Sequence, residues 1–461
     1  MKISLFNPDA RLNILSMKIY LSILFACSAA IAIAQPKQNS PYSRYGIGDP
    51  VNQFFAAQAG FAGQTEAFHD PFHLNLVNPA SYAFLRATTL DVGVYAKNSN
   101  YQSATSTLNN WSGNLAYLAL GFPLRSPINE VLDKRKSPWQ YGMGIAMTPF
   151  TLVGYNVNTT DTLPDLGVVR STYEGNGGTY RFTWSNAVKY KNTAFGLNLG
   201  WVFGKNIYEN TTFFPSDSFP TYSNTRRDDI RLNGLIWNVG VQHDFVLKYA
   251  ENDKETPTRW VTVGLTGESN HNIDANADRL FLRSRGRLSN GQYDSADTLL
   301  FETGADRKVT LPASFGLGIQ YVIANKLRVG GQYIFSNWSA FKNDARPNDA
   351  EYRNVSDISA GIEYVPDYAS YNNYFKRIRL RAGGYYRQDP RVINGQGLDD
   401  IGVTVGFGFP VVLPRQQTSF INAALEVGKL GNGSPIEEAY YRLTVGFTLN
   451  DNSWFYKRRF E

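Results

Sequence analysis

The sequence has one cysteine and four histidines among 461 residues, and this scarcity limits the chemistry that the chain can support. Cys27 lies in an expected leader, so the mature chain would have no thiol, no disulfide and no thiolate metal site. His69 and His73 have the spacing of a helical metal-binding pair, but Pro71 between them disrupts a helix. We therefore expect no metal ion and no other cofactor.

Catalytic and nucleotide-binding signatures are also missing. The sequence contains no Gly-x-Ser-x-Gly elbow, no P-loop and no dinucleotide fingerprint. We expect a protein that is not an enzyme, although a catalytic triad assembled only in space stays open as an alternative. The formal net charge is +6. The basic residues are scattered over turns and strand ends and form no basic face, which argues against nucleic-acid binding.

Long apolar runs are absent after the first 34 residues, so we expect no transmembrane helix there. Lys18, the apolar run 19–33 and the small residues up to Ala34 form the three parts of a secretory signal peptide. We expect cleavage after Ala34, with residues 1–16 as an N-terminal extension. The alternatives fit less well, because the run is about 15 residues and short for a membrane anchor, and the residues before Cys27 match a lipoprotein signal poorly.

The segment 35–87 has no regular periodicity. Gly and Pro interrupt it too often for a long helix, and we expect at most one short helix around residues 53–60. The segment is nevertheless too apolar for a disordered tail, because several phenylalanines, among them Phe55, Phe61 and Phe68, need burial. We therefore expect these residues to form a plug inside the structure that follows.

From residue 88 onward the sequence alternates between apolar and polar residues, which is the pattern of β-strands. In one clear example, Leu197, Leu199 and Trp201 share a face, and Asn198 and Gly200 lie on the other. About fourteen strands are expected, each near the 9 to 11 residues that a tilted membrane strand needs. They are 88–96, 114–122, 139–149, 180–190, 195–203, 233–245, 258–268, 315–322, 327–335, 357–364, 378–386, 400–409, 420–427 and 440–449.

The expected connections alternate in length. Tight turns are expected at 191–194 and 323–326, and the longest connections all follow odd-numbered strands. These are 150–179, 204–232, 269–314 and 336–356. Short turns at one end and long polar loops at the other are typical of outer-membrane barrels.

An exported chain with many amphipathic strands must satisfy its backbone hydrogen bonds in lipid, and only a closed barrel does so. We therefore predict an all-β fold, a transmembrane antiparallel β-barrel over residues 88–461, in the outer membrane of a Gram-negative bacterium. The long loops would be extracellular. Twelve or sixteen strands, an extra hairpin within 279–309 and a soluble sandwich or propeller are the alternatives. The amphipathic last strand with aromatic residues is the usual signal to the outer-membrane assembly machinery, and Trp454, Phe455 and Tyr456 behind it suit a membrane interface.

Three stretches in this order resemble the FadL-type outer-membrane transporters of long-chain fatty acids and other hydrophobic compounds. They are Asn78-Pro79-Ala80, then Leu311-Pro312-Ala313-Ser314-Phe315-Gly316-Leu317-Gly318 with Asn337-Trp338-Ser339, and then Arg379-Leu380-Arg381-Ala382-Gly383-Gly384-Tyr385 with Asp389-Pro390 and the strand 402–409. The resemblance covers essentially the whole mature chain. It implies a barrel whose lumen holds an N-terminal hatch, with Asn78, Pro79 and Ala80 as the plug motif.

The resemblance also implies a route for hydrophobic ligands, which would leave the lumen through an opening in the wall at a kinked third strand. Gly142, Gly144 and Pro149 are the candidates for this opening, although ordinary barrel curvature explains the glycines equally well. The loops depart from the family and contain apolar residues in polar surroundings. Of these, Phe213, Phe214 and Phe219 are candidates for ligand capture, with packing within the loop as the alternative.

The sequence thus favours a channel for the passive uptake of hydrophobic molecules such as long-chain fatty acids. The alternative is a barrel that docks exported proteins in a secretion system, or a structural outer-membrane protein. The expected partners are outer-membrane lipid, a hydrophobic small molecule and the outer-membrane assembly machinery. An apolar pocket behind the plug would favour the channel, and a polar, occluded lumen with apolar outer tips would favour the docking role.

Overall fold

The computed structural model describes residues 40–451 except 105, 126–136, 164–166, 215–220, 252, 288–292, 348 and 414–416. The expected leader, Phe219 and the aromatic residues 454–456 lie outside the described residues. No described helix is both long enough and apolar enough to span a membrane.

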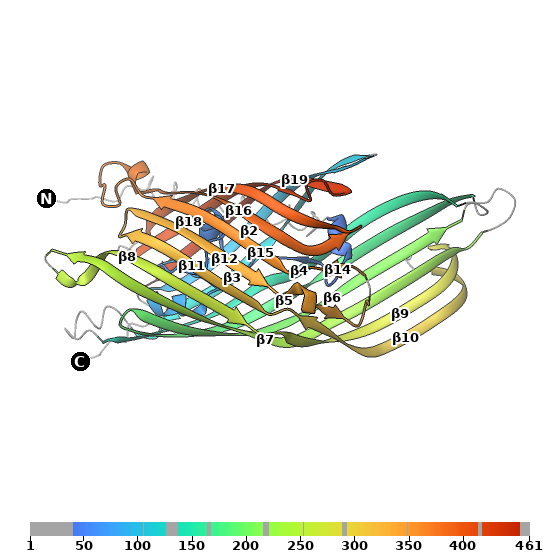
Figure 1. Cartoon of the computed structure of the whole chain (residues 1–461), viewed down its shortest axis with the longest axis horizontal. Helices are drawn as coiled ribbons and strands as arrows, with labels where there is room; N and C mark the ends of the chain where they lie inside the picture. The colour runs from blue at the N-terminus through green and yellow to red at the C-terminus, as the bar shows by residue number, and fades with distance from the viewer. Residues whose placement is uncertain are drawn as a thin grey trace, which may run out of the picture.

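Fourteen of the described strands form a closed antiparallel barrel around the N-terminal segment (Figure 1). Its strands are β2 (Thr88–Ser103), β3 (Thr107–Pro123), β4 (Trp139–Leu163), β5 (Gly167–Tyr190), β6 (Thr193–Phe213), β7 (Ser223–Ala250), β8 (Asp253–Glu268), β11 (Ser314–Ile323), β12 (Leu327–Ser336), β15 (Val355–Tyr364), β16 (Arg379–Ile393), β17 (Gln396–Leu413), β18 (Gln417–Leu430) and β19 (Ile436–Asp451). The barrel closes where β19 pairs with β2, from Asp451 opposite Thr88 to Ile436 opposite Ser103. The predicted fold class and strand number are confirmed.

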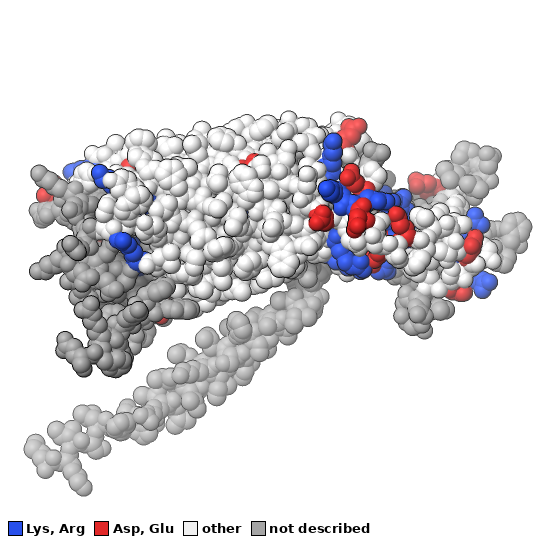
Figure 2. Space-filling view, turned by 90° about the horizontal axis from the view of Figure 1, so that it is seen from below, with Lys and Arg blue, Asp and Glu red and all other residues white. Residues whose placement is uncertain are grey.

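The alternation of side chains places apolar residues outside and small or polar residues inside. On β6, Leu199 and Trp201 are exposed, and the neighbouring Asn198, which faces the plug, is buried. On β17, Val403 and Val405 are exposed and Thr404 is buried. The outer surface therefore forms a broad belt with almost no charged side chains, which ends at a cluster of charges toward one end of the barrel (Figure 2). Such a belt is the surface that a lipid bilayer covers.

The expected tight turns are confirmed at one end of the barrel, which we call the turn end. There β5 and β6 meet at Lys191, and β11 and β12 meet at Asn325, both with positive φ. The opposite end, called the outer end, carries the connections from β8 to β11 and from β12 to β15. In outer-membrane barrels the end with the short turns generally faces the periplasm.

The strands next to the outer end are much longer than expected. Residues 150–179 and 204–232 were predicted as loops but continue β4, β5, β6 and β7, and β7 reaches 28 residues. The third predicted loop contains the extra hairpin that was considered, β9 (His271–Arg287) and β10 (Tyr293–Leu311), and β9 pairs with both β7 and β10. The physical reason is mutual pairing. Neighbouring hairpins supply each other's backbone hydrogen bonds, so polar Thr- and Asn-containing segments form strands without lipid around them.

We call this projection the outer sheet. It consists of residues 151–163 of β4, 167–179 of β5, 204–213 of β6 and 223–233 of β7, together with β9 and β10. Figure 1 shows it extending past the rest of the barrel at the end opposite the tight turns. A core that includes Tyr155, Tyr208, Ile230 and Ile273 packs on its inner face. This core explains why the extension is ordered without the bilayer.

The N-terminal segment lies inside the barrel. It contains the short elements η1 (Pro41–Arg44), β1 (Asp49–Pro50), α2 (Ala56–Ala59) and η2 (Pro79–Phe84), and α2 is the one short helix expected. Nearly all residues from 55 to 70 are buried. We use the word plug for residues 40–87. A second core joins plug residues such as Phe55, Leu74 and Tyr82 to the inner wall at Tyr117 and Ala146.

The connection from β12 to β15 folds over the start of the plug. It carries η3 (Trp338–Ala340), β13 (Lys342–Asn343) and β14 (Glu351–Tyr352). Strand β13 pairs with β10, and β14 pairs with β16. The long loop expected at 336–356 is therefore a small folded cap, because its two short strands extend existing sheet edges.

Candidate functional site in the plugged lumen

Asn78 is the best-connected residue of the predicted plug motif. Its side chain is fully buried, and its Oδ1 accepts a hydrogen bond from the Ala80 N–H at 3.1 Å, which caps η2 at Pro79. Its Nδ2 donates to the Glu66 carbonyl at 2.7 Å and lies 3.4 Å from the carbonyl of Val241 on the barrel wall. The motif therefore joins two stretches of plug to the barrel.

The inner wall of the barrel has glycine residues at the positions where the plug motif approaches it most closely. A Cβ added to Gly240 would lie 2.1 Å from Asn78 Oδ1, and one added to Gly196 would lie 2.3 Å from the Ala80 nitrogen. Any side chain at either position would therefore collide with the plug. These inward glycines let plug backbone and barrel backbone touch.

The same holds for Gly142 and Gly144, which were predicted as candidates for a lateral opening. A Cβ at Gly142 would lie 1.9 Å from the Tyr82 carbonyl oxygen, and one at Gly144 would lie 2.2 Å from the Tyr82 ring. Both glycines thus make room for η2 of the plug. This contact was not expected from the sequence, because it joins residues 60 positions apart through space.

Pro149 marks a separation in the wall. β3 and β4 pair only from Leu118 opposite Met147 to Pro123 opposite Gly142. On the other side of β4, its pairing with β5 shifts register between Pro149 and Thr151. Beyond this point β4 pairs with β1 of the plug instead of β3. The plug also reaches the seam with Gln53, whose Nε2 donates to the Pro149 carbonyl at 2.9 Å. We call this separation of β3 from β4 the seam.

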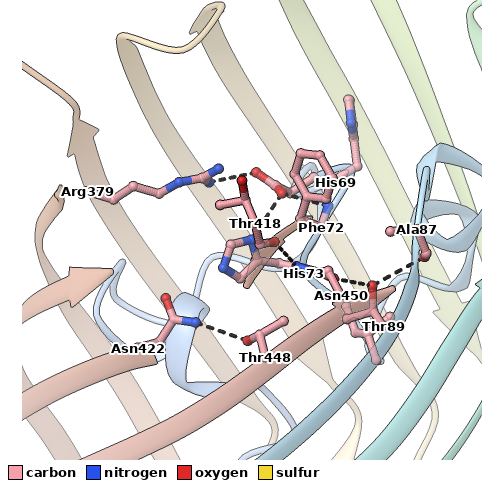
Figure 3. A network of polar contacts seen from close by, with 12 residues as sticks. His69, Phe72, His73, Ala87, Thr89, Arg379, Thr418, Asn422, Thr448 and Asn450 are labelled. Carbon is pink, nitrogen blue, oxygen red and sulfur yellow. Dashed lines mark hydrogen bonds and ion pairs between the residues drawn. The ribbon is translucent and has the colours of Figure 1, made fainter. Parts of the chain in front are cut away.

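A charged network holds the plug at the turn end. His69 lies 2.9 Å from Asp244 of β7, and Asp70 accepts a hydrogen bond from Arg379 of β16 at 2.8 Å. His73 lies 3.0 Å from Asp70. Figure 3 shows Arg379 extending from its strand toward His69, Phe72 and His73 of the plug. The predicted histidine pair is thus engaged with carboxylates, and the described residues contain no group of three potential metal ligands.

The network continues on the barrel wall. Arg381 donates to Glu363 at 2.6 Å and to Asn422 at 2.8 Å, and all three side chains are buried. Buried charges need such partners, because an isolated charge in a dry interior is strongly unfavourable. Sequence reasoning noted Arg379 and Arg381 only as part of a resemblance. Their signal was an arginine at two alternate positions, 379 and 381, next to the apolar residues Leu380 and Ala382.

The cap holds the plug at the outer end. Arg346 donates to the Arg44 carbonyl at 2.7 Å, and Asp349 accepts a hydrogen bond from the Gly46 N–H at 2.5 Å. Burial raises the pKa of Asp349 above its ordinary value, although the nearby Arg346 guanidinium acts in the opposite direction. Below the cap, Arg391 of β16 bridges Asp49 of the plug and Asp389. The plug is therefore fixed at both ends.

Cavities lie at both ends of the plug and beside the outer sheet. One of about 260 Å³ lies at the outer end next to β1. Its lining contains ten charged residues, which are Asp49, Lys97, Asp357, Arg387, Asp389, Arg391, Asp400, Glu426, Glu438 and Arg442. A second, of about 220 Å³, opens at the turn end, and a third lies on the inner face of the outer sheet. None of the three runs through the described lumen as an apolar passage.

The outer sheet presents apolar side chains to solvent. On β10, Leu299, Leu300 and Phe301 are exposed, and Phe301 retains 72% of its free surface. Phe213, a predicted capture residue, is exposed at the end of β6, and Phe214 is half-buried just beyond it. On the side away from β9, β10 pairs only at Val309 and Thr310 among the described residues. The Lys308 carbonyl also accepts a hydrogen bond from the Asp344 N–H, and the other described residues of β10 form no strand pairing on that edge.

Comparisons with known proteins place the chain. The family model BamG matches residues 16–461, and no curated protein matches. A FadL homologue from Pseudomonas aeruginosa is 15% identical with a TM-score of 0.54, covering 88% of this chain and 99% of its own. The monoaromatic hydrocarbon channel CymD is 15% identical with a TM-score of 0.51, covering 88% and 98%. The toluene transporter TbuX from Ralstonia pickettii is 13% identical with a TM-score of 0.50, covering 87% and 99%.

At these identities the solved structures establish a shared fold, and the resemblance to FadL-type barrels is confirmed at that level. The family match extends over nearly the whole sequence. This chain has the fold of the FadL-type barrels, and it belongs to the BamG family.

Proposed function

We propose that this protein is a permanently plugged outer-membrane barrel that serves as a docking component of the machinery for outer-membrane assembly. Membership in the BamG family supports a link to outer-membrane assembly. The observation that carries the proposal is the occlusion of the lumen. Plug and wall are in backbone contact at glycines, and charged pairs fix the plug at both ends.

A fixed plug is poorly suited to gating. Moving it would separate Asp70 from Arg379 and Asp49 from Arg391, and each of these side chains is largely buried. Breaking one buried pair by leaving a charge without its partner destabilises by about 3 to 5 kcal/mol. Both pairs together would be a large fraction of the stability of an ordinary domain.

The outer sheet supplies a surface for a partner. Leu300 and Phe301 lie beside an open strand edge, and an exposed edge with apolar side chains is a template for an added strand. Ion pairs on this strand, Arg307 with Glu302 at 3.1 Å and Arg279 of β9 with Glu302 at 3.7 Å, would form a polar rim.

Uptake of hydrophobic compounds, such as long-chain fatty acids, is the second candidate. The seam at Pro149 favours it, because the wall is unpaired there and the solved relatives with this fold are hydrocarbon channels. If the protein takes up such compounds, Phe213, Phe214 and Phe219 capture the ligand. Asn78, Pro79 and Ala80 then gate the lumen. The ligand leaves through the wall beside Gly142, Gly144 and Pro149. The plug residues paired with β4 would have to leave the seam first. The solved relatives are channels and not enzymes, which fits a non-enzymatic role.

The proposal includes the organisation of the chain. Residues 1–34 act as an extension and a signal peptide cleaved after Ala34, residues 35–87 form the plug, and residues 88–461 form the barrel. This leader would direct export across the inner membrane, and the apolar belt of the barrel supports the outer membrane of a Gram-negative bacterium as its location.

Affinity purification from native outer membranes tests the docking role. A tagged full-length chain, extracted in mild detergent, is expected to elute with components of the assembly machinery. The double variant Leu300→Glu, Phe301→Glu should reduce their yield at least tenfold, because it places charges in the apolar contact. Phe375→Glu at the turn end is the matched control, since Phe375 is equally exposed at 76%. Elution of the chain alone, or equal yields from both variants, would refute the proposal.

A further inference from the structure

The cavity at the turn end lies between the plug and the short turns and is open to the outside. Its volume is about 220 Å³, and its lining includes Phe72 and Phe84 of the plug and Trp260 and Phe420 of the barrel. Half or more of this lining is apolar in character, which distinguishes it from the charged cavity at the outer end. A site of this size is smaller than the pockets of about 300 to 1,000 Å³ that hold drug-sized ligands.

The aromatic walls are held in place by the plug. The Phe84 ring stacks on the His69 ring with centroids 3.8 Å apart, and His69 is itself fixed by Asp244. Phe84 is almost fully buried, and the Trp260 indole N–H is buried without a hydrogen-bond partner. A preformed aromatic wall of this kind favours a planar apolar group.

The charges around the cavity are unbalanced. The carboxylates that line it are already engaged, since Asp70 and Glu363 contact Arg379 and Asp244 contacts His69. By contrast, Lys189 and Lys326 have no described carboxylate within 4 Å, and the carboxylate that acts on Lys189 from farther away is that of Asp244, which already pairs with His69. Arg86, at the rim of the cavity, likewise forms no ion pair with a described carboxylate.

The Lys189 side chain lies directly beside the aromatic wall of the cavity. Its ammonium lies 4.1 Å above the Phe84 ring, so the cation and the aromatic wall are adjacent in the same cavity. A ligand with an anionic group and a ring would meet both at once. A strongly charged polyanion fits less well, because the aromatic walls offer it no hydrogen bonds.

We propose that this cavity binds a monocarboxylate that carries an aromatic ring, either as a free acid or as the C-terminal residue of a peptide. The carboxylate pairs with Lys189 and Lys326, and the ring lies against Phe84 and Trp260. The inference goes beyond the docking role and is independent of it, because the cavity lies at the opposite end of the barrel from β10.

Ligand titration of the full-length chain in detergent micelles tests this. The probes are 3-phenylpropionate, N-acetyl-phenylalanine, its amide, and a tripeptide with a free C-terminal phenylalanine, each followed by isothermal calorimetry. Saturable binding of an acid and at least tenfold weaker binding of the amide are expected. Binding of the tripeptide would identify a chain terminus as the source, and binding of the small acids alone would identify free acids.

The variant Lys189→Gln, Lys326→Gln should weaken acid binding about tenfold to a hundredfold, because it removes two charge-assisted contacts. Lys205→Gln is the matched control, since Lys205 lies in the outer sheet and pairs with Asp229. Heat-modifiable migration on gels reports that each variant has folded. Equal affinity for acid and amide, no saturable binding of any acid, or an unchanged affinity in the folded double variant would overturn the proposal.

Discussion

Replacing Gly142 with alanine should loosen the plug while leaving the barrel closed. The added Cβ would lie 1.9 Å from the Tyr82 carbonyl oxygen and 2.3 Å from its carbonyl carbon. Both atoms belong to backbone, so no side-chain rotation relieves the clash. Restoring an ordinary separation of at least 3.4 Å requires plug or strand to move by about 1.5 Å.

Overpacking in a dense interior typically destabilises by about 1 to 3 kcal/mol, and a collision of two backbones belongs at the upper end. A loss of about 3 kcal/mol in the free energy of local opening corresponds to about a hundredfold faster exchange of the amides that open with η2. The relevant amides include those of Ser81 and Leu85, which donate to Asn78 and Tyr82.

Hydrogen exchange followed by mass spectrometry on the purified barrel measures this directly, with peptides that cover residues 74–85. Gly267→Ala on β8 is the matched control, because a Cβ there has no atom within 4 Å. Equal exchange of these peptides in the two variants would refute the view that Gly142 positions the plug.

Two further predictions concern plug and wall contacts. Asn78→Ala removes the cap of η2 and the bond to the Glu66 carbonyl, so local opening should become easier by about 2 kcal/mol, read as about thirtyfold faster exchange at Ala80; unchanged exchange would show that the motif is only a turn. Arg381→Met leaves the buried Glu363 with Arg379, at 3.8 Å, as its remaining ion-pair partner. The variant should lower the free energy of unfolding by about 3 kcal/mol in urea titrations. Adding Glu363→Gln should recover most of this loss. If the double variant is no more stable than the single one, the pair does not act as described.

The general architecture followed from local signals. Period-two alternation, the two tight turns and the extra hairpin are properties of short stretches, and these expectations are confirmed. The strand lengths were wrong in the outer sheet. Segments such as 150–163 are rich in Thr and Asn, and their strand character depends on pairing with neighbouring hairpins.

The plug contacts were beyond sequence reasoning for a different reason. Asp70 and Arg379 are 309 positions apart, and only closure of the barrel brings them together. The glycines of β4 had two local explanations, a bend or ordinary curvature. Their contact with Tyr82 depends on the path of the plug, which contains too little regular structure to be derived from periodicity.

We claim that the plug stays in place while the protein functions. An engineered disulfide between Ala62→Cys of the plug and Thr404→Cys of β17 would lock it, because the Ala62 nitrogen lies 3.1 Å from Thr404 Oγ1 and the sequence has only one other cysteine. The measurement is the flux of toluene and a long-chain fatty acid into proteoliposomes that contain the reduced or the oxidised variant. A docking component should give no flux above that of empty liposomes in either state. Saturable flux in the reduced state that stops on oxidation would contradict the claim and establish a moving plug.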